Sequence, residues 1–400
     1  MIEARNILCI STPAWEGPYA STTVQLMKEL GSQNKILFVN NPFTLKDVAD
    51  GIKKKKTVPV KKVFGFKSRL KIFPGTHNGS VYVLTPPMVL TVNFLPKGYW
   101  HRAVMNFNGW LLKQTIRKYL KKLDMEEELV HLVSFNPALG LELGRQFNEK
   151  LLLYLCYDEI SAAPHLKKHG IWQEERFAKM ADATIVTSQG LLDRKKHIAK
   201  NCYLVRNGAN FGLFSKGFNA EIGSKKVIGF IGGIDRRLDY PLLEHLISSM
   251  PEAEFRFVGR INFQEGADRL RKFPNVVLSG SRPLAELPEM VRHFSVGIIP
   301  FKLSDFIKTV YPLKINEYLA AGVPVVTTNF SYLNDFASVV RIAENKEEFC
   351  SFVIEEALND SVEKKRARQE LAKLNSWEHR AEELSQIITK LERSMSPERV

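Results

Sequence analysis

The sequence has little of what marks disulfide frameworks, metal sites and membrane spans. Its four cysteines are far apart and none forms a C-x-x-C pair, which predicts buried, reduced thiols. No apolar run reaches the roughly 18–20 residues that cross a bilayer. The N-terminus enters a strand directly and has no cleavable signal pattern. We therefore expect a cytoplasmic globular protein.

Acidic residues are scarce as well, since 57 Lys and Arg face 43 Asp and Glu and the formal net charge is +14. Residues 53–71 contain nine basic side chains and no acid, with valines and phenylalanines interleaved. Such a stretch suits an anionic membrane surface, or it is a solvated, mobile loop. No helix-turn-helix, zinc-finger or RNP motif accompanies it, so we expect no nucleic-acid partner.

What is present is a regular alternation of apolar strands and amphipathic helices over 400 residues, too many for one ordinary core. This order predicts an α/β protein with two Rossmann-like, doubly wound domains facing a cleft. We place an N-terminal domain at 1–211, a linker at 212–226 and a second domain at 227–375. Residues 376–400 are expected to form a helix that packs back toward the first domain.

The segment from Tyr311 to Thr328 combines a short helix, a stop at Gly322 and a β-branched strand. Lys314 and Glu317 are three residues apart and share a face of the first helical turn. They could form an ordinary surface ion pair. Alternatively, a cation and a carboxylate at a helix N-terminus could bind a phosphate and a sugar hydroxyl.

A second candidate site follows the first strand of the second domain. Gly232 and Gly233 lie between a strand and a helix, where glycine lets a phosphate approach the backbone. Arg236 and Arg237 add cations that suit phosphate oxygens. The alternative is a tight turn with two solvated arginines.

Residues 227–342 resemble the donor domain of GT-B glycosyltransferases of group 1 (family 4-like), as found in bacterial cell-surface polysaccharide synthesis. The resemblance rests on an ordered set of motifs rather than on any one of them. They are Gly-Gly with Asp235-Arg-Arg-Leu-Asp239, Phe257-Val-Gly-Arg260, Pro274-Asn-Val-Val-Leu-Ser-Gly280, and Gly297-Ile-Ile-Pro-Phe301 leading into 311–326. Residues 183–190 and 204–210 resemble first-domain segments of the same family.

The resemblance implies a nucleotide-diphosphate sugar as donor. Lys314 would meet the diphosphate and Glu317 the ribose hydroxyls, while Gly232, Gly233, Arg236 and Arg237 would line the phosphate side. The absence of a D-x-D motif fits an enzyme with no metal and no other cofactor. Thr309 stands eight residues before Glu317, where many retaining members have a second glutamate, so retention and inversion both stay open.

Asp158 follows the predicted strand 151–155 and should therefore lie at a carboxyl end of the first sheet. A carboxylate there could take the proton of an acceptor hydroxyl, as an inverting enzyme requires. It could equally cap a helix or fix a loop.

The sequence thus predicts a hexosyltransferase-like enzyme with a polysaccharide or lipid-linked acceptor, peripheral at the inner membrane face. The alternatives are a nucleotide-sugar epimerase of the same frame and an inactive nucleotide-sugar-binding protein.

Overall fold

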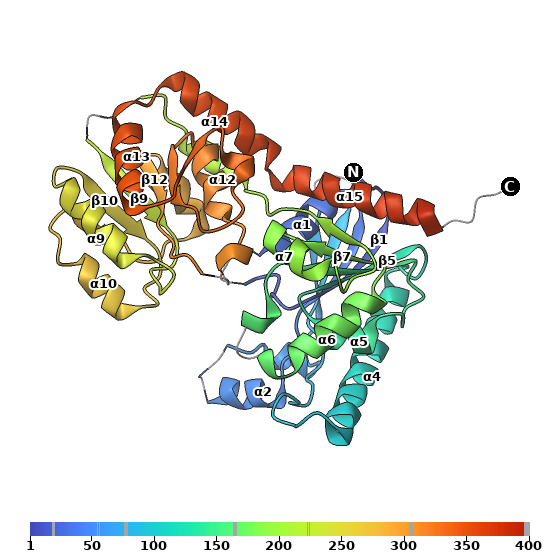
Figure 1. Ribbon diagram of the computed structural model, residues 1–400. Coiled ribbons are helices and arrows are strands. Elements are labelled where there is room, and N and C mark those ends of the chain that lie inside the picture. The colour runs from blue at the N-terminus through green and yellow to red at the C-terminus, as the bar shows by residue number, and fades with distance from the viewer. Residues whose placement is uncertain are drawn as a thin grey trace. The chain divides into compact units, whose positions relative to one another are not determined.

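The computed structural model describes residues 1–17, 21–53, 55, 57–75, 79–162, 166–221, 223, 225–304 and 307–395. The chain divides into two compact units (Figure 1). Unit 1 comprises Met1–Arg206 and Arg380–Val400, and unit 2 comprises Asn207–His379. Each unit is built on its own sheet, so the predicted α/β class with two doubly wound domains is confirmed.

Unit 1 contains an eight-stranded sheet in the order β3-β4-β2-β1-β5-β6-β7-β8. All neighbours are parallel except β3, which runs antiparallel to β4. The sequence did not predict β3, which begins at the end of the basic segment 53–71. The strands are β1 (Asn6–Ser11), β2 (Lys35–Val39), β3 (Leu70–Pro74), β4 (Ser80–Leu84), β5 (Leu129–Ser134), β6 (Leu151–Cys156), β7 (Ala183–Val186) and β8 (Cys202–Leu204).

Helices cover both faces of this sheet, with α1 and α15 on one side and α4, α5 and α6 on the other (Figure 1). On the second face, Leu112 and Ile116 of α4 pack into one apolar cluster with Leu8 of β1 and Leu37 of β2. The helices are α1 (Thr22–Leu30), α2 (Leu45–Ile52), α3 (Val60–Val63), α4 (Tyr99–Lys122), α5 (Pro137–Leu143), α6 (Lys167–Met180) and α7 (Gln189–Lys195), with a 3-10 turn η1 (Ile160–Ala162).

Unit 2 contains a six-stranded, fully parallel sheet in the order β11-β10-β9-β12-β13-β14. The strand order reverses between β9 and β12, and doubly wound sheets bind ligands at the carboxyl ends of strands beside such a reversal. The strands are β9 (Val227–Ile231), β10 (Glu254–Val258), β11 (Val276–Leu278), β12 (Val296–Ile299), β13 (Val325–Thr328) and β14 (Val340–Ala343). The helices are α8 (Phe211–Phe214), α9 (Tyr240–Ser249), α10 (Gln264–Leu270), α11 (Leu287–Val291), α12 (Leu313–Ala320), α13 (Lys346–Leu358) and α14 (Val362–Leu374).

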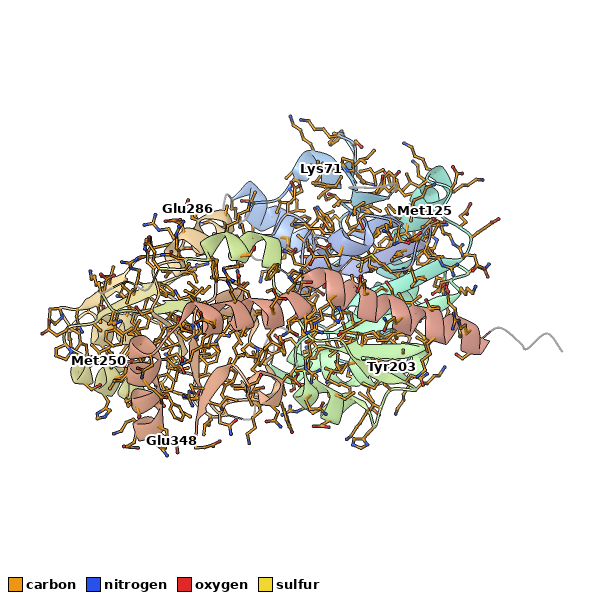
Figure 2. All side chains as sticks on the ribbon, turned by 90° about the horizontal axis from the view of Figure 1, so that it is seen from above. Lys71, Met125, Tyr203, Met250, Glu286 and Glu348 are labelled. Carbon is orange, nitrogen blue, oxygen red and sulfur yellow. The ribbon has the colours of Figure 1, made fainter. Side chains whose placement is uncertain are left out.

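The segment expected to be a linker, 212–226, belongs to unit 2 where the structure describes it. It begins inside α8, and Phe214 is buried in the apolar core of that unit. The last helix, α15 (Trp377–Met395), starts in unit 2 and continues in unit 1 from Arg380. There Glu392 pairs with Arg5 at 2.7 Å, and the Lys390 ammonium lies 5.5 Å from the ring of Tyr203, beside α15 in Figure 2.

None of the helices that the structure describes combines the length and the apolar composition needed to cross a bilayer.

Candidate functional site

The turn after β9 is shaped by glycines that allow close approach. Gly232 has φ +143°, and a Cβ there would lie 2.3 Å from Cε of Lys314. A Cβ on Gly259 would lie 1.8 Å from the carbonyl oxygen of Gly232. The Gly232 position therefore serves two purposes: it makes the turn, and it leaves room for the Lys314 side chain to cross it.

Helix α12 is fixed against the sheet by Tyr318, which is buried. Its hydroxyl oxygen accepts a hydrogen bond from the Ile231 N–H at 2.7 Å. A Cβ on Gly297 would lie 2.7 Å from the Tyr318 ring, so glycine in β12 makes room for it. This packing directs the first turn of α12, with Lys314 and Glu317, toward the carboxyl ends of β9 and β12.

Two cations meet over the aromatic ring that follows β12. The ring of Phe301 lies 5.6 Å from the Lys314 ammonium and 5.4 Å from the Arg237 guanidinium. Arg237 is held by Asp235, whose carboxylate accepts from Nε at 3.0 Å and Nη2 at 2.6 Å. Burial alone would raise the pKa of Asp235, but the hydrogen bonds from Arg237 hold it below its usual value. Asp235 therefore stays ionised and orients the guanidinium.

Lys314 has no such partner among the residues that the structure describes. No ion pair joins it to Glu317, so the pair is not the ordinary surface ion pair that the spacing also allowed. Burial lowers the pKa of Lys314 and the positive charge of Arg237 lowers it further, and the negative charges of Glu317 and Asp235 raise it by less than this. A partly buried ammonium beside a second cation favours an anion at this place.

Glu317 lies one helical turn beyond Lys314 and is partly buried. Burial raises its pKa to about 7, although the nearby Lys314 acts in the opposite direction. Within the described part of the chain, its carboxylate accepts no hydrogen bond from protein. A carboxylate in that condition can accept hydrogen bonds from ligand hydroxyl groups.

Two further residues named from the sequence, Arg236 and Thr309, do not join the cations at Phe301. Arg236 is exposed and its guanidinium stacks 4.3 Å from the ring centre of Phe263, so it does not join the cations on Phe301. Thr309, at the position where a second glutamate was expected, is buried in the 3-10 turn η4 (Ile307–Thr309).

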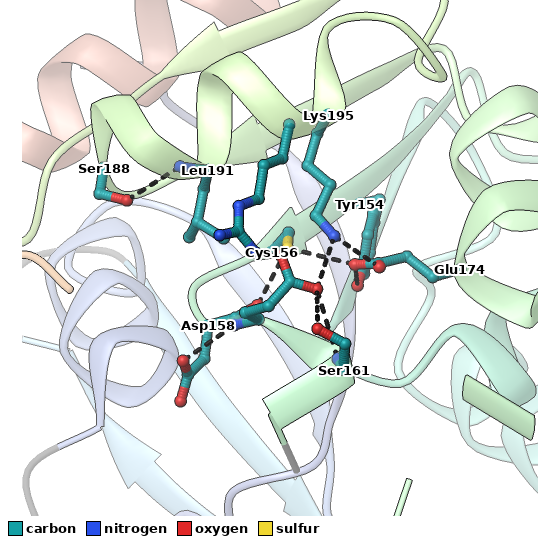
Figure 3. A network of polar contacts seen from close by, with 10 residues as sticks. Tyr154, Cys156, Asp158, Ser161, Glu174, Ser188, Leu191 and Lys195 are labelled. Carbon is teal, nitrogen blue, oxygen red and sulfur yellow. Dashed lines mark hydrogen bonds and ion pairs between the residues drawn. The ribbon is translucent and has the colours of Figure 1, made fainter. Parts of the chain in front are cut away.

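In unit 1, Asp158 follows β6 as predicted and is partly buried. Its Oδ1 accepts a hydrogen bond from the Glu159 N–H at 2.8 Å, so the carboxylate contributes to the local turn. Figure 3 shows the carboxylate directed away from Lys195 and Glu174.

A buried network of charges lies beside Asp158 (Figure 3). The ammonium of Lys195 is 3.2 Å from Glu159 and 2.7 Å from Glu174. Glu174 also accepts a hydrogen bond from the Tyr154 hydroxyl at 2.8 Å. Burial opposes the charge on Lys195, but the surrounding acidic groups raise its pKa. These contacts tie α6, α7 and the loop after β6 together, and so fix the backbone that carries Asp158.

A cavity of about 220 Å³ lies at the carboxyl ends of β1, β2 and β5 in unit 1. None of the described side chains that line it carries a charge. Phe135, at its wall, has φ +49°, which is rare for an aromatic residue and marks a strained strand end. The Phe135 ring packs on Tyr157, the residue before Asp158, with centroids 4.6 Å apart. The cavity is therefore close to the candidate base.

Sequence reasoning missed the Asp235–Arg237 pair, the ring of Phe301 and the uncharged cavity. A signal for the first existed, because Asp235 and Arg237 are two residues apart in a turn. The cavity gathers residues from distant segments and has no local signal. The described residues contain no cluster of three or more His, Cys, Asp or Glu that could hold a metal ion. Metal independence stays a prediction.

Comparison with known proteins agrees with this geometry. Residues 225–359 match the family model described as glycosyl transferases group 1. Most of unit 2 is therefore similar to group 1 glycosyl transferases. This match confirms the resemblance drawn from the sequence motifs, and it includes Gly232, Arg237, Lys314 and Glu317.

A relative in Bacillus subtilis (strain 168), the putative teichuronic acid biosynthesis glycosyltransferase TuaH, is 34% identical over 172 residues. The match covers 39% of this chain and 42% of that protein, so the chain spans less than half of the relative's length in this alignment.

Solved structures extend the similarity in fold to both units. Sucrose-phosphate synthase from Thermosynechococcus elongatus has a TM-score of 0.65 at 15% identity, covering 98% of this chain and 100% of that chain. Trehalose-6-phosphate synthase from E. coli, bound with UDP-2-fluoro glucose, has a TM-score of 0.63 at 11% identity and covers 96% and 99%. Anabaena HepE in complex with UDP and glucose has a TM-score of 0.63 at 13% identity, with the same coverage. The group 1 domain thus lies in a GT-B fold.

Proposed function

We propose that the protein is a glycosyltransferase that moves a sugar from a nucleotide-diphosphate sugar to a polysaccharide or lipid-linked acceptor. The observation that carries this proposal is the ammonium of Lys314, which has no carboxylate partner in the described chain and meets Arg237 over the Phe301 ring. This pair lies at the carboxyl ends of β9 and β12, where the strand order of unit 2 reverses.

The donor diphosphate would lie against the Gly232–Gly233 turn and the N-terminus of α12. No side chain caps that N-terminus, so its partial positive charge is available to an anion. Glu317 would accept hydrogen bonds from the ribose hydroxyls. Support comes from the group 1 match and from the UDP-containing neighbours of the same fold.

The reaction would then break the bond between the donor sugar and its diphosphate. Negative charge grows on the departing diphosphate, and Lys314 with Arg237 would stabilise it without a metal. Arg236, stacked on Phe263, would contribute only a more distant positive charge.

On the acceptor side, we propose Asp158 as the general base. It would take the proton of the acceptor hydroxyl, whose oxygen forms the new bond to the sugar carbon. The uncharged cavity beside Tyr157 and Phe135 would hold the acceptor. A base in this role implies inversion, which NMR of the anomeric centre in the product tests directly.

A membrane-linked acceptor would also give the basic segment 53–71 a role at the inner face of the membrane. Lys54 and Lys56 lie outside the described residues. Phe66, within this segment, is 82% exposed and lies in sequence between Lys62 and Lys67. Replacing Lys61, Lys62 and Lys67 with serine should weaken sedimentation with anionic vesicles at low salt. An unchanged bound fraction would remove this segment from the proposal.

The function is tested with a panel of nucleotide sugars, with and without EDTA. A glycosyltransferase releases nucleotide in the presence of acceptor, an epimerase changes the sugar without release, and a binding protein does neither. We expect release that EDTA does not abolish and that Asp158→Asn lowers by about a hundredfold or more, the range of general base catalysis. Nucleotide binding by Asp158→Asn should be unchanged. No release with any donor would reject the proposal.

A further inference from the structure

The longest stretch without acidic residues coincides with much of the surface of unit 1. Residues 51–123 contain sixteen Lys and Arg and no Asp or Glu. Helix α4 occupies residues 99–122 of this stretch and is the longest helix that the structure describes. The helix itself therefore contains no acidic side chain to compensate its basic ones.

The outward face of α4 exposes aromatic side chains. Trp100 is 71% exposed, Trp110 is 56% exposed and Phe107 is 46% exposed, with Tyr99 beside them at 77%. At 3.6 residues per turn, these four positions fall on one side of the helix. The opposite side, which includes Leu112 and Ile116, is buried against the sheet. Exposed aromatic residues grouped in this way mark an interaction surface.

The same face becomes basic toward the C-terminal end of the helix. Lys118 and Lys121 are exposed and pair with no carboxylate in the described chain. Arg117 is also exposed and donates a hydrogen bond to the carbonyl oxygen of Gln146 at 2.9 Å. The face thus joins an aromatic half to a cationic half.

The aromatic half adjoins the uncharged cavity of unit 1. The inner side of α4 contributes Met105 and Asn108 to the wall of this cavity. The preceding loop lines it with Asn93 and then presents Phe94, which is 69% exposed. Lys168 of α6 holds that loop through a hydrogen bond to the Phe94 carbonyl oxygen at 2.8 Å.

We propose that the outward face of α4, together with Phe94, docks on the surface of an anionic lipid bilayer. Tryptophan and tyrosine favour the bilayer interface, where the ring meets apolar chains and the polar edge meets water. The lysines and Arg117 would meet anionic headgroups. A second copy of the same face is the alternative occupant, and the measurements below distinguish it from a bilayer. This proposal does not depend on glycosyl transfer.

The test uses the two exposed tryptophans, Trp100 and Trp110, since Trp15 and Trp377 are buried and Trp172 of α6 is only partly exposed. On vesicles of phosphatidylcholine and phosphatidylglycerol, the tryptophan emission of the full chain should shift to the blue and be quenched by brominated lipid. Trp100→Phe with Trp110→Phe should bind within twofold of the original protein and lose most of the shift. Trp100→Ser with Trp110→Ser should bind at least tenfold more weakly.

A matched control replaces Phe64 and Phe66, also exposed and aromatic but outside α4, with serine. Its partition should fall less than that of the α4 serine variant, and both variants should keep the original melting temperature because the altered side chains are exposed. Equal binding by the α4 serine variant, or no vesicle binding by the original protein, would overturn the proposal. So would a dimer, or a complex with single-stranded nucleic acid, that the α4 variant specifically abolishes while vesicle binding persists.

Discussion

Two lysines, one in each unit, are shielded from solvent, Lys195 fully and Lys314 in part, but differ in the charged groups that they contact. Lys195 of unit 1 contacts two carboxylates, Glu159 and Glu174, and its pKa is raised. Lys314 of unit 2 has no carboxylate within ion-pair distance among the described residues, and its pKa is lowered. Burial acts on both in the same direction, so the difference comes from the partners.

The difference indicates that Lys195 stabilises the fold and that Lys314 can bind an anionic ligand. Removing one partner of a buried ion pair leaves charge uncompensated, which is strongly unfavourable. Removing an unpaired buried cation relieves a desolvation cost instead. The same substitution should therefore damage stability in unit 1 and binding in unit 2.

The largest effect is expected for Lys195→Ala. It leaves Glu174 buried without its cation and Glu159 with Arg194 alone, at 3.5 Å, and should lower the free energy of unfolding by about 3–5 kcal/mol. Urea denaturation at pH 7 measures this. Lys196→Ala, at a half-exposed neighbour paired with Asp193, should change stability by less than about 1 kcal/mol. Equal stability of the two variants would mean that the network of Figure 3 does not hold unit 1 together.

Lys314→Ala should show the reverse pattern. We expect it to weaken binding of a nucleoside diphosphate by about 30-fold, near 2 kcal/mol, because a charge-assisted contact to phosphate is lost. Its stability without ligand should be equal to or above that of the original protein. Calorimetric titration with UDP measures the binding, and the exposed Lys272→Ala is the control. Loss of stability without loss of binding would assign Lys314 a structural role.

Glu317→Gln tests the electrostatic environment of unit 2 through the pH dependence of stability. The pKa of Glu317 is raised to about 7 in the folded chain, so its ionisation opposes folding as the pH rises through the interval from about 4.5 to 7. The glutamine variant should nearly match the original protein at and below pH 4.5 and exceed it by about 3 kcal/mol at pH 8. Chemical denaturation across this range reports the difference. A pH-independent difference would show that the carboxylate is not the cause.

Much of the secondary structure could be predicted from the sequence, because apolar periodicity is a local property. The strand predicted at 151–155, for example, is β6 (Leu151–Cys156) in the structure. Strand β3 was not predicted, since it is an edge strand with an exposed, basic pattern, and only its pairing with β4 makes it a strand. The segment predicted as a linker contains Phe214, whose burial in unit 2 depends in the same way on distant residues.

The same distinction applies to the candidate site: residues in contiguous motifs could be predicted, and contacts between side chains could not. Gly232, Gly233, Lys314 and Glu317 were named because their motifs are contiguous in the sequence. The lack of an ion pair between Lys314 and Glu317 depends on side-chain directions that spacing does not fix. Lys195 carried one overlooked signal: it lies four residues after the buried Leu191 on the same helix face, where an apolar residue would be expected.

The smallest expected effect is the difference in UDP binding between variants of Arg236 and Arg237, the two arginines of the turn after β9. Arg237 meets Phe301 beside Lys314 and is oriented by Asp235, whereas the exposed Arg236 stacks on Phe263. We expect Arg237→Ala to weaken UDP binding about tenfold, near 1.4 kcal/mol, and Arg236→Ala to weaken it less than twofold. Arg237→Lys should fall between them, because it keeps the charge but loses the two-pronged contact with Asp235. Calorimetric titration at fixed salt measures all three, and a larger loss for Arg236→Ala than for Arg237→Ala would move the anion site from Phe301 toward Phe263.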